Sequence, residues 1–225
     1  YAAFLLEGND ISGIDVGFLV NKKLKVKSVS QLGLHTRQVA SNAFLFDRPP
    51  LLLELDRPEC GPEKLSFVVV HNRSFRGLNQ PEKRQRVRKK RMEQAEWLGG
   101  WVNARLQLHP NEALVLLGDF NALPGGVELL RMQRKASGGA SPSLLDLGLK
   151  VPLKERYSFR FRGKKQAIDH MFVTKNLVSF VQNVYYTRFN TEGYQSVALG
   201  ERVSDHEGLV AQFDFEGCKA EGAGP

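Results

Sequence analysis

Carboxylate, imidazole and amide side chains follow or precede several short apolar segments of this chain. One such segment, residues 113–117, is followed directly by Gly118-Asp119-Phe120-Asn121. A short apolar run bounded by turn residues is typical of a buried strand. Asp119 and Asn121 are two residues apart, so in extended backbone their side chains point the same way. An anionic oxygen ligand beside a neutral amide suits a hard cation and a phosphate oxygen, although an ordinary Asx turn explains the same residues.

Four other clusters place chemically capable residues next to apolar segments. Each by itself has a simpler explanation as a cap, a turn or a partnered surface histidine. Together they supply several carboxylates, histidines and an amide, and catalytic residues at strand ends are how active sites are built on a β scaffold. The clusters are Gly13-Ile14-Asp15, His71-Asn72-Arg73-Ser74, Ile168-Asp169-His170 and Ser204-Asp205-His206.

The elements that must position these residues are short strands and one long helix. Apolar runs of strand length occur at residues 16–20, 51–55, 65–70, 113–117, 168–173 and 209–215. Helical spacing of apolar residues extends from Pro81 to about Leu108 and ends before Pro110. A second helix is expected at 126–135, followed by a Gly/Ser/Pro-rich loop at 136–143. With no interior linker, residues 1–216 are predicted to form one domain and 217–225 a disordered tail.

The order of the motifs resembles the endonuclease/exonuclease/phosphatase superfamily. Gly118-Asp119-Phe120-Asn121 and Ser204-Asp205-His206 match its two most specific signatures. His71-x-x-Ser74 is similar to the His-x-Lys-Ser variant of bacterial nuclease-like members. The resemblance implies an α/β fold, the four-layered αββα sandwich, in which two mostly antiparallel sheets lie between helices.

The resemblance also implies a mechanism, in which water attacks a phosphoester with the help of Mg²⁺ or Mn²⁺. In that mechanism Asp119 positions or deprotonates the water, and Asn121 holds the attacked phosphate or the water. His206 contacts a phosphate oxygen or transfers a proton, and Asp169 orients it. His71 has the companion role at the phosphate.

Other roles follow from the same resemblance. Asp205 is expected to bind the metal, and Asp15 to orient His71. Arg48, Arg73 and Ser74 are expected to bind the substrate. The alternative for Arg48 is an arginine at the rim of the site that makes no contact with phosphate. The strands that carry an Asn and a metal-binding Glu in this superfamily are not visible in the chain, so weak metal binding and low activity are expected of it.

The charge of the chain favours a polyanionic partner. The formal net charge is +8 and the pI is about 9.6, which is typical of proteins that bind nucleic acid or anionic surfaces. Lys or Arg occupies seven of the nine positions 83–91, either as a phosphate-binding patch or as a solvated helix face. No apolar run is long enough to cross a membrane, and no stable membrane association is expected. The two cysteines, Cys60 and Cys218, form no disulfide framework, which leaves the compartment open.

These observations favour a non-specific metal-dependent nuclease that acts on DNA or RNA. Two alternatives stay open: a phosphomonoesterase or phospholipid or inositol-phosphate hydrolase of the same fold, and a nucleic-acid-binding relic without catalytic activity.

Overall fold

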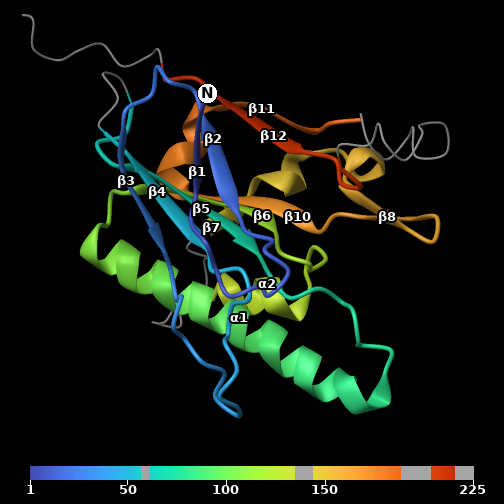
Figure 1. Ribbon diagram of the computed structural model, residues 1–225. Helices are drawn as coiled ribbons and strands as arrows, with labels where there is room; N and C mark the ends of the chain where they lie inside the picture. The colour runs from blue at the N-terminus through green and yellow to red at the C-terminus, as the bar shows by residue number, and fades with distance from the viewer. Residues whose placement is uncertain (57–60, 135–143, 189–203, 216–225) are drawn as a thin grey trace, which may run out of the picture.

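The computed structural model describes residues 1–56, 61–134, 144–188 and 204–215 (Figure 1). The predicted long helix is present as α1 (Pro81–Leu108). The second helix is shorter than predicted, α2 (Val127–Met132), and the predicted loop at 136–143 and tail at 217–225 lie outside the described residues. The strands are β1 (Ala2–Leu5), β2 (Gly17–Val20), β3 (Val26–Gln31), β4 (Leu51–Leu55), β5 (Leu65–His71), β6 (Ala113–Asp119), β7 (Leu144–Asp146), β8 (Phe159–Phe161), β9 (Lys164–Gln166), β10 (Asp169–Thr174), β11 (Val181–Tyr186) and β12 (Leu209–Phe213).

A six-stranded sheet in the order β3-β4-β5-β6-β10-β7 forms the centre of the fold. All its neighbouring strands are antiparallel except β5 and β6, which are parallel because α1 carries the chain back between them. Successive side chains of β6 alternate between two apolar cores: Leu114 and Leu116 belong to one and Val115 to the other. A strand buried on both faces is a continuous apolar run, and for this reason these central strands were predictable.

Helices α1 and α2 cover one face of this sheet (Figure 1). Gly99 lies where the two helices approach each other, and a Cβ there would come within 2.6 Å of the Met132 carbonyl oxygen. The glycine that weakens the middle of α1 as an isolated helix therefore permits close packing on α2. Leu98 and Val102 of the same turn are buried against the sheet.

Two ribbons, β1-β2 and β11-β12, lie over the opposite face of the sheet (Figure 1). Phe4, Phe18, Val184 and Phe213 of these ribbons pack on the second core. Helices, the sheet and a layer of ribbons thus follow one another, and the predicted α/β sandwich class is confirmed.

A network of charged residues is buried at the end of the sheet where β6 begins. The Glu112 carboxylate, with a side-chain exposure of 0%, accepts hydrogen bonds from Arg105 and from Ser66. Glu54 also pairs with Arg105 and accepts a hydrogen bond from Ser28 at 2.6 Å. These groups fasten α1 to the sheet.

The predicted site residues lie together at the other end of these strands. Because β5 and β6 are parallel, both end there, and the antiparallel strand β10 begins there. Short strands with fixed register at one edge are a rigid support for catalytic side chains.

Candidate active site

The sheet register places three of the predicted residues in one lateral row. His71, the last residue of β5, is the partner of Asp119 on β6, and Asp119 is the partner of Asp169 on β10. The His71 Nε2 atom is 3.5 Å from Asp119 Oδ2. Hydrogen-bonded ladders fix this row, so its order does not depend on loop conformation.

Asp119 and Asn121 form one closed unit after β6. The Asn121 backbone N–H donates to Asp119 Oδ1 at 2.7 Å, and the Asn121 side-chain amide donates to Asp119 Oδ2 at 2.9 Å. This is the Asx turn given in the sequence analysis as the alternative explanation of these residues. The same turn holds the amide and the carboxylate side by side. Gly118 makes the turn possible, since its φ is +125° and a Cβ would come within 2.2 Å of the Val70 carbonyl oxygen.

A buried arginine of α1 holds the loops after β5 and β6 together. Arg91 donates at 2.7 Å both to the Arg73 carbonyl and to the Asn121 carbonyl, and it pairs with Glu128 of α2 at 2.7 Å. Its side chain is only 3% exposed. Asn121, which has a positive φ of 49°, is thereby fixed from its side chain and from its backbone.

Asp169 and His206 form a hydrogen-bonded pair, with 2.7 Å between His206 Nδ1 and Asp169 Oδ2. Although partial burial opposes it, the hydrogen bond and charge of Asp169 raise the pKa of His206. Asp169 is itself held by its backbone: its N–H donates to Ser158 Oγ, and its carbonyl accepts from the Tyr186 hydroxyl at 2.9 Å.

Two carboxylates and an imidazole form a group that suits a cation. One ligand atom each from Asp119, Asp169 and His206 lie within 4.8 Å of one another. Burial and the nearby charge of Asp169 raise the pKa of Asp119 to about 7. The pair of carboxylates therefore favours a positive partner, either a proton or a divalent ion such as Mn²⁺ or Mg²⁺.

On the other side of the row, His71 faces an arginine. Arg48 Nη1 lies 2.9 Å from Nδ1 and 2.7 Å from Nε2 of His71. A guanidinium only donates, so it can bond only a ring nitrogen without hydrogen. In agreement, burial and the charges of Arg48 and His206 lower the pKa of His71 to about 4, which leaves its ring neutral.

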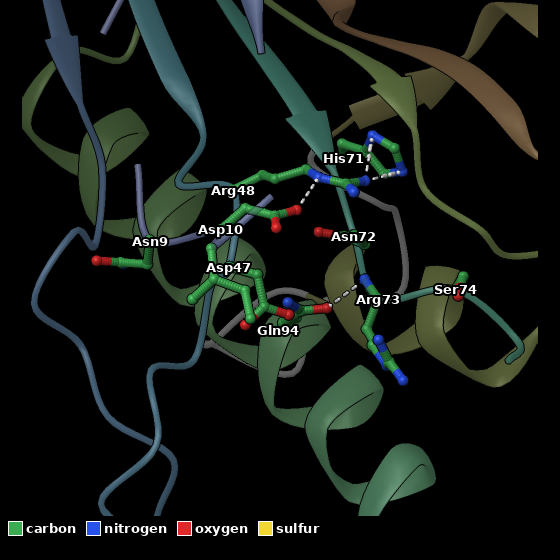
Figure 2. A pocket seen from close by; sticks show the side chains of 10 residues that line it. Asn9, Asp10, Asp47, Arg48, His71, Asn72, Arg73, Ser74 and Gln94 are labelled. Carbon is green, nitrogen blue, oxygen red and sulfur yellow. Dashed lines mark hydrogen bonds and ion pairs between the residues drawn. The ribbon is translucent and has the colours of Figure 1, made fainter. Parts of the chain in front are cut away.

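The carboxylate that pairs with Arg48 on the side away from His71 is Asp10. In the sequence analysis, Asp15 is the carboxylate expected to orient His71. Arg48 Nε donates to Asp10 Oδ2 at 2.9 Å (Figure 2). Asp15 instead accepts a hydrogen bond from the Gly8 backbone N–H at 2.9 Å. The loop between β1 and β2 thus folds so that Asp10, and not Asp15, reaches Arg48, while Asp15 bonds the backbone of the loop.

A cavity of about 320 Å³ opens beside His71 (Figure 2). Arg48, Arg73 and Ser74, the predicted substrate-binding residues, all line it. The Asn72 side-chain oxygen is buried next to it with no hydrogen-bond partner among the described residues. The cavity therefore offers positive charge and polar groups to a ligand bound against His71.

Asp205, the predicted metal ligand, is not part of the cation-binding group. Its side chain is exposed, whereas that of its neighbour His206 turns toward Asp169. His206 pairs with Phe159 in a β-bridge, and successive side chains in extended backbone point in opposite directions. The structure therefore brings Asp119, Asp169 and His206 together and leaves the Asp205 side chain exposed.

Three supporting residues escaped the sequence analysis: Asp10, Arg91 and His170. His170 Nδ1 is 2.8 Å from Asp146 Oδ2, and Nε2 is 2.8 Å from the Ala122 carbonyl oxygen. Because both partners are acceptors, the buried ring donates from both nitrogens and supports the loop after Asn121 from below. The sequence signal for His170 was its position next to Asp169 in the Asp-His motif. That position does not show whether the histidine supports the site from the protein interior or binds a ligand.

Comparisons with known proteins agree on one fold. The structure is similar to truncated TDP2 from Caenorhabditis elegans, with 16% identity, a TM-score of 0.56, and coverage of 86% of this chain and 68% of that one. It is similar to the 3′ phosphatase NExo from Neisseria bound to a product DNA hairpin, with 19% identity, a TM-score of 0.54 and coverage of 85% and 72%. A mannosyl-6-phosphatase from Bacteroides thetaiotaomicron has 18% identity, a TM-score of 0.60 and coverage of 95% and 77%.

The chain spans 56% of a longer C. elegans TDP2 structure. No curated protein matches the sequence. At these identities the structural likeness establishes the fold, which is the four-layered αββα sandwich predicted above. The model of the Endonuclease/Exonuclease/phosphatase family matches residues 10–206. That match includes every residue of the site described here, and the chain belongs to this family, whose members are hydrolases acting on phosphoesters.

Proposed function

We propose that this protein is a divalent-metal-dependent phosphodiesterase that hydrolyses nucleic acid, with DNA as the favoured substrate. The lateral row in which Asp119 lies between His71 and the Asp169–His206 pair carries this proposal. The DNA hairpin bound to the Neisseria relative and the basic charge of this chain support the choice of substrate.

The residues present fit a divalent ion, which the carboxylates of Asp119 and Asp169 would hold. When bound, such an ion neutralises phosphate charge and stabilises the leaving oxygen. Because the ion competes with a proton for Asp119, its affinity is expected to fall as the pH decreases through about 7.

The chain's own groups then divide the work at the phosphate. Asp119, held by Asn121, orients the attacking water and can accept its proton. His206 keeps Nδ1 on Asp169, which leaves Nε2 to donate to a phosphate oxygen. On the other side, the Arg48 guanidinium next to His71 offsets phosphate charge.

The test is cleavage of supercoiled plasmid in Mg²⁺, in Mn²⁺ and in EDTA. We expect metal-dependent nicking that falls at least about 100-fold in Asp119→Asn and stays within about twofold of wild type in Asp56→Asn. Asp56 is an exposed carboxylate after β4 and serves as the matched control. Binding of plasmid without cleavage in either metal would contradict the proposal and indicate a non-catalytic nucleic-acid-binding protein.

A phosphomonoesterase is the second candidate, because the Bacteroides mannosyl-6-phosphatase has the same fold. Release of inorganic phosphate from a sugar phosphate, with plasmid left intact, would support it.

Among the described residues no helix is long and apolar enough to span a membrane.

A further inference from the structure

A second cavity, of about 340 Å³, adjoins the cavity beside His71. The two have Asp47 and Arg73 in common as lining residues. The second cavity continues between the loop around Ser41 and the N-terminal half of α1, where Arg86 and Lys90 line it. Together the cavities form one groove, here called the α1 groove, which leads from His71 to Arg86.

Positive charge in the α1 groove is only partly neutralised. Lys90 is paired with Asp47, with both Nζ–Oδ distances at 2.8 Å. In the part of the chain that the structure describes, no carboxylate lies within 4.0 Å of the cationic groups of Arg73 or Arg86. Figure 2 shows that the Arg73 side chain points away from His71, so its guanidinium does not duplicate that of Arg48.

The neighbouring surface of α1 extends this charge. Lys83, Arg84 and Arg88 are exposed, and no described carboxylate lies within 4.0 Å of them. Among the described carboxylates, Lys89 has one within 4.0 Å, that of Glu93 at 3.9 Å. Neighbouring exposed cations without a carboxylate partner repel one another and lower the stability of the fold slightly. A bound polyanion would remove this repulsion.

The basic segment is fixed relative to the active site. Arg91, one turn after Val87, donates to the backbone of Arg73 and of Asn121. At a rise of 1.5 Å per residue, Arg84 lies about 10 Å along the helix from Arg91, which is about three nucleotide steps of a B-form strand. The basic turns of α1 thus extend over about three nucleotide steps from the residue that holds the site loops.

We propose that the α1 groove binds the phosphodiester backbone of a nucleic-acid strand whose reacting phosphate lies between His71 and His206. This inference rests on the proposed function and adds the path of the strand away from the site. A nucleic acid is favoured over an anionic membrane because the charges line a groove that ends at a phosphoester site. The contacts are to phosphates, so they position the strand without reading its sequence.

The test is binding of fluorescein-labelled single strands of about 4 and about 16 nucleotides, measured by anisotropy in EDTA over a range of salt concentrations. The variant is Arg84→Glu/Arg86→Glu. The matched control is Lys22→Glu/Lys23→Glu, which makes the same charge change in the exposed turn between β2 and β3. Far-ultraviolet circular dichroism checks that each variant is folded.

For the α1 variant we expect at least about tenfold weaker binding of the long strand and a salt slope smaller by about 1.4, the value for two lost phosphate contacts. The control should stay within about twofold of wild type. Hydrolysis of bis(p-nitrophenyl) phosphate, which is too small to extend from His71 to Arg84 or Arg86, should be unaffected in both. If wild type hydrolyses nothing, the proposed function fails while the binding result still tests the groove. Equal losses in the two variants, or lost binding to phosphatidylserine vesicles with oligonucleotide binding intact, would overturn the inference.

Discussion

Replacing Arg91 with methionine tests whether the site loops are held by one buried cation. Methionine keeps an unbranched side chain of helix-favouring type, so the change removes the guanidinium and little else. The Arg91 side chain is 3% exposed and bonds the Arg73 carbonyl, the Asn121 carbonyl and the Glu128 carboxylate, each at 2.7 Å.

The expected loss of stability follows from what is left behind. Two backbone carbonyls lose a charged donor, and each such hydrogen bond contributes about 1.5–3 kcal/mol. Glu128, with 21% of its side chain exposed, recovers part of its hydration, so its loss is smaller than for a fully buried partner. These terms overlap, and the variant should lose about 3–5 kcal/mol of unfolding free energy.

Urea unfolding followed by tryptophan fluorescence measures this loss directly. Trp97 and Trp101, the two tryptophans of the chain, both lie on α1 and pack against the core on that side of the sheet. Arg131→Met is the matched control, because its ion pair with Glu96 also joins α1 and α2 but is 48% and 52% exposed. The control should lose no more than about 0.5 kcal/mol. A loss below about 1 kcal/mol in Arg91→Met would refute the reasoning that this residue holds the loops.

Three further outcomes are expected. Gly118→Ala, which forces a Cβ within 2.2 Å of the Val70 carbonyl at a φ of +125°, should cost about 3 kcal/mol in the same urea assay. Burial raises the pKa of Glu54, but Ser28, Arg105 and Lys64 outweigh burial and lower this pKa from 4.5 to about 2. The ionised Glu54 therefore stabilises the fold above about pH 4.5, and that stability is lost as the pH falls toward 2. Wild type should therefore lose more stability than Glu54→Gln between pH 5 and about 3, seen as a larger fall in the urea midpoint. His170→Phe should lose about 3 kcal/mol in thermal unfolding, and adding Asp146→Asn should restore part of it, since no unpaired buried charge then remains.

The strands of the central sheet could be predicted because burial on both faces makes them continuous apolar runs. Residues 51–55 are a strand with the predicted bounds, β4, and α1 ends at Leu108 as predicted. Strands β3 and β8 were missed for the opposite reason. The residues of β3 are half-buried or exposed, and β8 is a three-residue arm of an exposed hairpin, so neither has an apolar run to detect.

In the candidate site, too, residues at strand ends could be predicted from the sequence, whereas a residue on a loop could not. His71, Asp119 and Asp169 could be assigned from motifs because each lies at a strand end, where sequence position determines spatial position. Asp10 could not be found, because it reaches Arg48 through the turns of the loop between β1 and β2. In a loop with two aspartates, Asp10 and Asp15, sequence alone does not show which one faces the site and which one bonds the loop's own backbone.

This division indicates which half of the site sets the chemistry and which sets the substrate. The row from His71 to His206 depends on strand register, and a register slip by one residue would turn every side chain to the other face. Arg73 lies on a loop, and Lys83, Arg84, Arg86 and Arg88 lie on an exposed helix surface, where substitution costs little stability. On the proposed function, the hydrolytic chemistry would therefore be tied to the fold, whereas the choice between a strand of nucleic acid and a small phosphoester would change with a few charges around the α1 groove.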